Sequence, residues 1–156
     1  MAAAIRRAAA GDVPALVALW KEMWEAHRAA DPRMEASPMA ELVMRRWMEE
    51  HLASERSEIV VADEGGRLVG YALGTILENP PVVPHQFHGY FSDLSVTATS
   101  RRGGIGRRLA EAMHDWFRAK RMPYVQVNVA VKNGVARSFW RRAGYAEFVE
   151  QLRMEL

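Results

Sequence analysis

Three closely spaced glycines, Gly103, Gly104 and Gly106, separate a strand-like segment from a helix-like one. Residues 89–97 alternate between apolar and polar side chains, as strands do, and a stripe of apolar residues at helical spacing follows the glycines. Residues 124–131 are rich in valine and alternate again, which predicts a second strand. A strand, a helix and a further strand joined in this order form a crossover that is almost always right-handed. The sequence therefore predicts a mixed α/β fold.

Helical stripes and turn residues predict the other elements around this unit. Capping residues and prolines bound the helices, and runs rich in Val, Ile and Leu flank a turn at residues 63–66. The predicted elements are a strand at residues 5–8, helices at 12–27 and 37–53, a hairpin of strands 57–62 and 67–77, a loop at 78–86, a helix at 135–142 capped by Asn133, and a last strand at 145–156.

The composition sets the class of protein. The chain has 156 residues, of which 49% are hydrophobic and 26% charged, so it is globular and long enough for one core. We expect a single domain over residues 1–156. The apolar runs are too short to cross a bilayer, no signal-peptide core is found near the start, and cysteine is absent. These features predict a cytoplasmic protein that does not bind a membrane.

The glycine turn has the features of a phosphate site. The first N–H groups of a helix lack helical acceptors, and the helix dipole places positive charge beside them. Arg101, Arg102 and Arg107 add further positive charge. The Walker sequence is absent, and the dinucleotide pattern Gly-x-Gly-x-x-Gly fails at Leu109. The turn therefore predicts another phosphate-bearing cofactor, and a simple tight turn with solvated arginines is the alternative.

At these residues the chain resembles the GCN5-related N-acetyltransferase (GNAT) superfamily. Its signature [Q/R]-x-x-G-x-[G/A] is matched by Arg101, Gly104 and Gly106, and the run Leu94-Ser95-Val96 precedes it at the family spacing. Residues 133–145 are similar to the later pattern N-x-x-A-x-x-[F/L]-[Y/W]-x-x-x-G-[F/Y], and the Ile5-Arg6 pair with Asp12 is similar to the opening of the family.

The resemblance implies a fold, an activity and a cofactor site. The fold is a mixed, mostly antiparallel sheet of six to seven strands with about four helices, splayed between strands 4 and 5. The activity is transfer of an acetyl group from acetyl-coenzyme A (acetyl-CoA) to a primary amine of a small molecule, peptide or protein. Backbone groups of Leu94 and Val96 are expected to pair with the pantetheine arm. The implied cofactor-binding residues are Leu94, Ser95, Val96, Arg101, Arg102, Gly103, Gly104, Ile105, Gly106, Arg107, Asn133, Phe139 and Trp140.

The catalytic side chains are less clear, because two positions depart from the family. Trp140 stands where relatives often have a tyrosine that protonates the leaving thiolate. Ser92 stands where some relatives have a carboxylate that acts as the base. Adjacent strand residues face opposite ways, so Asp93 replaces that carboxylate only if the strand bulges. The candidates are Glu78, Asp93 and Tyr90, followed by His85 and His88. No metal is expected, because the two histidines lack a third ligand at a useful spacing.

Other functions remain as alternatives. Without the usual catalytic side chains, the protein could bind acyl-CoA as a sensor and catalyse no reaction. Binding of nucleic acid through the arginine clusters is not expected, because the nearby aromatic residues belong to apolar stripes. Homodimers are common in the resembling family, so a homodimer is one expectation for this chain. Acidic residues in the segments expected to form the acceptor pocket favour a cationic amine: Glu22, Glu25, Asp31, Glu35 and Glu78.

Overall fold

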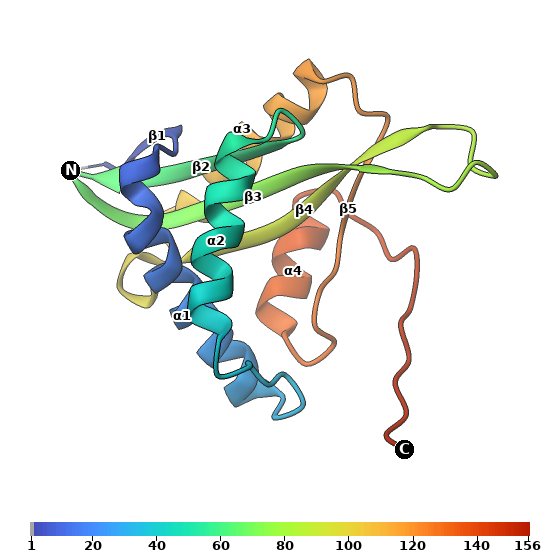
Figure 1. The fold of residues 1–156 in the computed structure, drawn as a ribbon, viewed down its shortest axis with the longest axis horizontal. Helices are drawn as coiled ribbons and strands as arrows, with labels where there is room; N and C mark the ends of the chain where they lie inside the picture. The colour runs from blue at the N-terminus through green and yellow to red at the C-terminus, as the bar shows by residue number, and fades with distance from the viewer. Residues whose placement is uncertain (1) are drawn as a thin grey trace.

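The computed structural model of the protein describes residues 2–156. Over this range it contains a five-stranded sheet in the order β1-β2-β3-β4-β5, with helices on both faces (Figure 1). The elements are β1 (Ala4–Arg7), α1 (Val13–Ala30), α2 (Ala40–Ala53), β2 (Ser57–Glu64), β3 (Arg67–Glu78), β4 (Phe87–Val96), α3 (Ile105–Ala119), β5 (Val125–Val127) and α4 (Gly134–Arg142). None of the helices in residues 2–156 is long and apolar enough to span a membrane.

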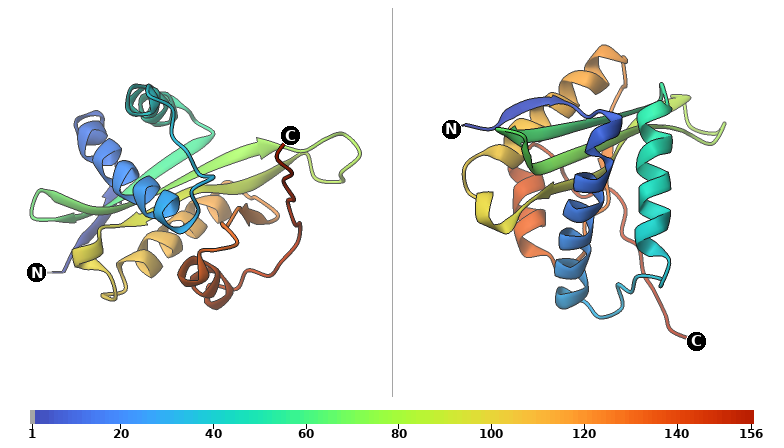
Figure 2. Two further views of the ribbon diagram at one scale, coloured as in Figure 1. Left: turned by 90° about the horizontal axis from the view of Figure 1, so that it is seen from below. Right: turned by 60° about the vertical axis from the view of Figure 1, so that its left-hand side comes forward.

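The sheet lies between two helical layers, which Figure 2 shows edge-on. Because side chains alternate along a strand, Tyr71 and Leu73 of β3 point to the layer of α1 and α2, while Ala72 points to the layer of α3 and α4. Leu16 of α1 and Leu109 of α3 are fully buried and belong to the two separate cores. Helices thus cover both faces of the central strands.

The sheet opens between β4 and β5. These two strands pair in parallel over three residue pairs only, from Gly89 with Val125 to Phe91 with Val127. Strand β4 continues to Val96, five residues further, while β5 ends at Val127. The second half of β4 therefore has β3 on one side and an opening on the other, as the family resemblance implied.

Two predictions about the strands are wrong. The sheet has five strands, not six or seven, and residues 145–156 are extended but form no strand with any described part of the chain. The predicted strand at 124–131 is also shorter, because only Val125–Val127 lie beside β4. A strand requires a neighbouring backbone for its hydrogen bonds, and side-chain alternation alone does not supply one. The helices and the hairpin of β2 and β3 agree with the sequence to within a few residues.

Candidate active site

The glycine turn between β4 and α3 has the backbone expected of a phosphate site. Gly104 has φ +76°, a left-handed conformation that favours glycine. The first hydrogen bond of α3 runs from the N–H of Arg108 to the carbonyl of Gly104, at 3.1 Å. The N–H groups of Ile105, Gly106 and Arg107 precede this bond and have no helical acceptor. A Cβ on Gly104 would meet no atom within 4 Å, so the space outside the turn is open to a ligand.

The edge of β4 also presents polar backbone groups to the opening. The N–H of Thr97 donates to the carbonyl of Val69 on β3, at 2.8 Å. Successive residues of a strand point their backbone groups to opposite sides, so those of Val96 and Leu94 face away from β3. The Arg101 side chain agrees, because its Nε donates to the carbonyl of Val96 at 3.0 Å. The two N–H groups are therefore placed to bind a chain that enters between β4 and β5.

Helix α4 covers the other side of the opening. The Asn133 side chain caps it by accepting the N–H of Ala136 at 3.0 Å. Phe139 lies against the turn, since a Cβ on Gly106 would be 3.5 Å from its ring. Trp140 is buried, and its ring packs edge-on against Phe91 with centroids 4.8 Å apart. Trp140 thus has a structural role in the core and no acidic proton to offer.

Not every residue implied by the resemblance points a side chain toward the opening. Ile105 is buried and anchors α3 in the core. Ser95 is also buried, and its hydroxyl donates to the carbonyl of Leu19 on α1 at 3.4 Å. Arg102 and Arg107 are exposed, and Arg107 is paired with Glu111 at 2.7 Å. An anion at the turn would therefore be bound mainly by backbone N–H groups, with the exposed guanidinium groups around them.

A β-bulge in β4 determines the faces of the candidate bases. Leu73 pairs with Asp93, but the next residue of β3, Gly74, pairs with Phe91, so Ser92 is an extra residue. Asp93 accepts a hydrogen bond from the Tyr71 hydroxyl at 3.0 Å. The Ser92 hydroxyl lies 3.4 Å from that of Thr75, which is on the same face of β3 as Tyr71. Both side chains therefore point to the layer of α1 and α2, which an unbulged strand would not allow.

Burial changes the acidity of the Asp93 carboxyl and of the Tyr90 phenol. Removal from water raises the pKa of the Asp93 carboxyl to about 6, although the hydrogen bond from Tyr71 acts to lower it. Burial and the nearby Asp93 charge also raise the pKa of Tyr90, which keeps that phenol protonated. Tyr90 is therefore a poor base at neutral pH, whereas a carboxylate with a pKa near neutrality can accept a proton.

The other candidate bases lie at the far end of the β3–β4 hairpin. Glu78 is exposed at the end of β3. It lies five residues beyond Leu73, the residue that pairs with Asp93, which is ~17 Å along the strand. His88 lies five residues before Asp93 on β4, and its ring stacks on Tyr124 with centroids 5.5 Å apart. The structure brings Asp93 and Tyr90 together and leaves Glu78, His85 and His88 apart from them.

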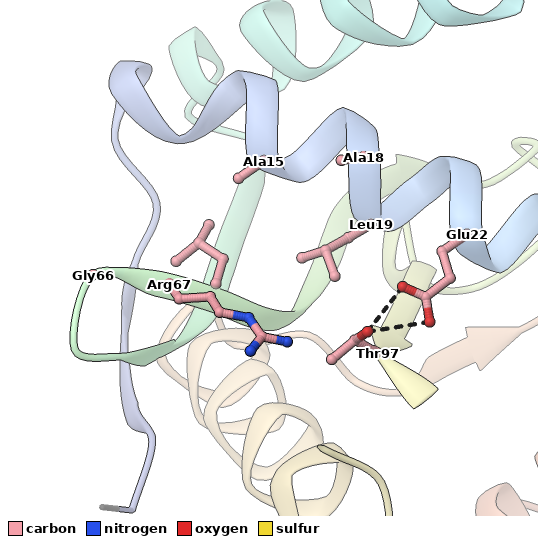
Figure 3. Close-up of a pocket in the computed structure, with 8 residues that line it drawn as sticks. Ala15, Ala18, Leu19, Glu22, Gly66, Arg67 and Thr97 are labelled. Atoms are coloured by element: carbon pink, nitrogen blue, oxygen red, sulfur yellow. Dashed lines mark hydrogen bonds between the residues drawn. The ribbon is translucent and has the colours of Figure 1, made fainter. Parts of the chain in front are cut away.

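Two of the acidic residues expected near the acceptor are already paired. The Glu22 carboxylate accepts the Thr97 hydroxyl at 2.9 Å and the N–H of Ala98 at 2.8 Å, which ties α1 to the end of β4. Figure 3 shows this contact in a hollow between α1 and the turn from β2 to β3. Asp31 is paired with Arg33 at 2.6 Å, which lowers the pKa of its carboxyl. Asp93 lies outside the hollow, four residues back along β4.

Sequence reasoning missed two parts of this site. Tyr71 lies in an apolar run of β3 and was given no role, because nothing in the sequence places its hydroxyl beside Asp93. The bulge at Ser92 was considered as a condition but not predicted, since bulges leave no clear local pattern when no glycine marks them. The adjacent polar pair of Ser92 and Asp93 in an otherwise alternating strand was the one available signal.

The fold and the site together define a class of protein: a mixed α/β domain in which two strands diverge beside a glycine turn with free N–H groups. The sequence model of the Acetyltransferase (GNAT) family matches residues 16–145. The chain belongs to this family, as the sequence resemblance predicted.

Individual relatives agree with this assignment. The chain is 28% identical over 111 residues to an N-alpha-acetyltransferase, daf-31, of Caenorhabditis elegans, a match that covers 69% of this chain and 58% of that protein. A mutant protein from Bacillus halodurans has a crystal structure with a TM-score of 0.88 and 26% identity, covering 98% of this chain and 99% of the other. A predicted acetyltransferase from Clostridium acetobutylicum, solved with acetyl-CoA, shares the fold at 17% identity and a TM-score of 0.80, covering 98% and 96%. The chain thus spans little more than half the length of the Caenorhabditis elegans N-alpha-acetyltransferase.

Proposed function

We propose that the protein is an N-acetyltransferase in which Asp93 is the general base. One observation carries this proposal: the bulge at Ser92 turns a partly buried carboxyl with a pKa of about 6 to the face of the sheet covered by α1 and α2. Acetyl-CoA is the co-substrate, because the chain belongs to an acetyltransferase family and has a glycine turn with free N–H groups beside an opened strand edge.

The residues of the chain support a direct transfer. In this proposal the N–H of Val96 polarises the thioester carbonyl, which is supported by its position in the strand backbone on the side away from β3. Asp93 takes the proton that the acceptor ammonium must lose before its nitrogen can attack. The new bond joins that nitrogen to the acetyl carbon, and the bond from carbon to sulfur breaks. The sulfur leaves as a thiolate, which needs little assistance because thiols of this kind have a pKa of about 8.5. The second proton, which the nitrogen loses as the amide forms, goes to this thiolate and gives the free thiol of CoA.

The acceptor is a primary amine of a small molecule or peptide. Glu22 and Asp31 are engaged in contacts within the chain, so the charge available to attract a cationic amine comes from Asp93 and from exposed residues such as Glu25 and Glu35. A panel of polyamines, amino sugars and peptides with free amino groups covers the chemistry that this site can accept.

The test is release of free thiol from acetyl-CoA with each amine of the panel. Asp93→Asn should lower kcat/KM for the accepted amine at least 100-fold at pH 7, and Glu78→Gln, an equal change of charge at an exposed position, should alter it less than twofold. If the two variants behave alike, Asp93 is not the base.

A sensor that binds acyl-CoA without turnover is the second candidate. It is favoured by Trp140, which fills the position of the usual acid with a buried indole. Calorimetry separates the two functions: binding of acetyl-CoA without thiol release from any amine of the panel would support the sensor.

A further inference from the structure

Helices α1 and α2 cover their face of the sheet unevenly. Four strand residues are buried in the core beneath these helices: Ile59, Val61, Tyr71 and Leu73. They come from β2 and β3, and within residues 2–156 no residue of β4 or β5 joins them. Helix α1 crosses β4 near the end of the strand, where the Ser95 hydroxyl donates to the carbonyl of Leu19. On this face, the earlier part of β4 and the adjoining β5 therefore lie outside the apolar core.

A set of polar side chains occupies this part of the face. We call it the polar strip, and it consists of Tyr90, Ser92, Asp93, Gln126 and Asn128. Tyr90 of β4 pairs with Gln126 of β5, so their side chains point to the same face. Val127 and Val129 pack in the core on the other face, so the side chain of Asn128 between them points to the strip. None of the five strip residues is buried.

The polar strip carries one charge at neutral pH, that of Asp93. His88 lies on the same face of β4, but burial lowers the pKa of its imidazole, which is therefore neutral at pH 7. Lys132, in the loop after β5, is paired with Asp31 at the end of α1 at 3.8 Å. The hydroxyl and carboxamide groups of the strip can donate and accept hydrogen bonds. This arrangement suits a molecule with one ammonium group and a neutral polar body.

The strip extends from Asp93 in the direction away from the cofactor turn. The turn follows Val96, at the end of β4, whereas Tyr90 lies three residues before Asp93. The pair of Tyr90 and Gln126 is thus ~10 Å from Asp93 along the strand. An acceptor with its amine at Asp93 and the cofactor on one side has this length of strip for the rest of the molecule. A sugar ring with its substituents or a dipeptide spans it.

We propose that Gln126 selects the acceptor, by hydrogen bonding to the neutral polar body of an amine whose nitrogen reaches Asp93. This inference rests on the proposed function, in which Asp93 is the base. The substrate class is a primary monoamine with hydroxyl or amide groups, and its two sources are an amino sugar and a short peptide with a free amino terminus. An alkylamine is a poor acceptor because it leaves the carboxamide unpaired, and a diamine because its second ammonium finds no second carboxylate in the strip.

The first test is kcat/KM from thiol release with four amines: glucosamine, alanylalanine amide, cyclohexylamine and putrescine. The wild type should use one of the first two at least tenfold better than either of the last two. Preference for glucosamine identifies the sugar as the source, and preference for alanylalanine amide identifies the peptide. Gln126→Met keeps the length of the side chain and should lower kcat/KM for the preferred amine roughly three- to tenfold, through KM. It should leave the value for cyclohexylamine unchanged.

Gln86→Met is the matched control, because it makes the same replacement at an exposed residue just before β4. It should change kcat/KM for each amine less than twofold. Both variants should keep the circular dichroism spectrum and the acetyl-CoA affinity of the wild type, which shows that the fold and the cofactor site are intact.

The second test is calorimetry of the same amines with protein saturated with CoA, which measures acceptor affinity without turnover. The same preference, reduced in Gln126→Met, is expected. Selective binding without thiol release from any amine would contradict the proposed function and leave this inference standing. The inference is overturned by a wild type that prefers neither glucosamine nor alanylalanine amide, or by a Gln126→Met variant that weakens all four amines alike or none of them.

Discussion

Replacing Tyr71 by phenylalanine removes one hydroxyl from a fully buried position and leaves the ring in place. That hydroxyl donates to Asp93 at 3.0 Å, and it is the hydrogen bond that acts to lower the pKa of the carboxyl. Hydrogen bonds to charged groups contribute roughly 1.5–3 kcal/mol. One pKa unit corresponds to about 1.36 kcal/mol, so loss of the bond should raise the pKa of Asp93 by about 1–2 units. From about 6, the pKa would move to roughly 7–8.

The direction of the effect on activity follows from this shift. The carboxylate is the form that accepts a proton, so a higher pKa means that the base is lost at a higher pH. At pH 7 the ionised fraction falls from about nine-tenths to between about a half and a tenth, and kcat/KM should fall about two- to tenfold. At pH 9 the base is ionised in both proteins, and the difference should nearly disappear.

The assay is the pH profile of kcat/KM from thiol release, measured from pH 5 to pH 9. The acidic limb of Tyr71→Phe should lie 1–2 pH units above that of the wild type. Tyr90→Phe is the control. It removes a hydroxyl from the same face of the sheet, but this hydroxyl is not hydrogen-bonded to Asp93. An acidic limb that does not move in Tyr71→Phe would refute the assignment of Asp93 as the group that this limb reports.

Three other predictions follow from the same geometry. Burial raises the folded pKa of Asp93 above its unfolded value of 3.8, so the contribution of this group to stability falls as pH rises from about 4 to 6 and is level above that. Asp93→Asn should therefore be more stable than wild type by about 1–3 kcal/mol in urea unfolding at pH 8, and equally stable at pH 4. Gly104→Val should weaken acetyl-CoA binding at least tenfold in calorimetry. Gly65→Val, at φ +63° in the turn after β2, is the control: both variants should lose about 1–2 kcal/mol of stability, but Gly65→Val should leave the affinity for acetyl-CoA unchanged. Equal affinities in the two glycine variants would place the pyrophosphate elsewhere. Trp140→Tyr should keep acetyl-CoA binding and raise kcat, and a loss of binding would contradict the view that this position is a vacant acid site.

The parts of the protein that depend on local sequence could be predicted. The glycine turn is one, because a left-handed residue at Gly104 and free N–H groups at a helix start are local requirements. The cap of α4 by Asn133 follows in the same way from a pattern within a few residues. The diverging end of β4 was implied only by the family resemblance.

The parts that depend on contacts between distant segments could not. Tyr71 and Asp93 are 22 residues apart and meet only because β3 and β4 pair in one register. That register contains an extra residue, which reverses the face of Asp93 relative to a regular strand. Residues 145–156 gave the opposite error: their side chains alternate as those of a strand do, but alternation alone supplies no neighbouring backbone to pair with.

The most direct test of the account is thiol release from acetyl-CoA by the wild-type chain and by Asp93→Asn, side by side, across the amine panel at pH 7.5. The account predicts that at least one primary amine releases thiol with the wild type and that Asp93→Asn, which still binds acetyl-CoA, releases it at least 100-fold more slowly. Equal rates for the two proteins would contradict the role of Asp93, and a wild type that does not bind acetyl-CoA would contradict the proposed cofactor site.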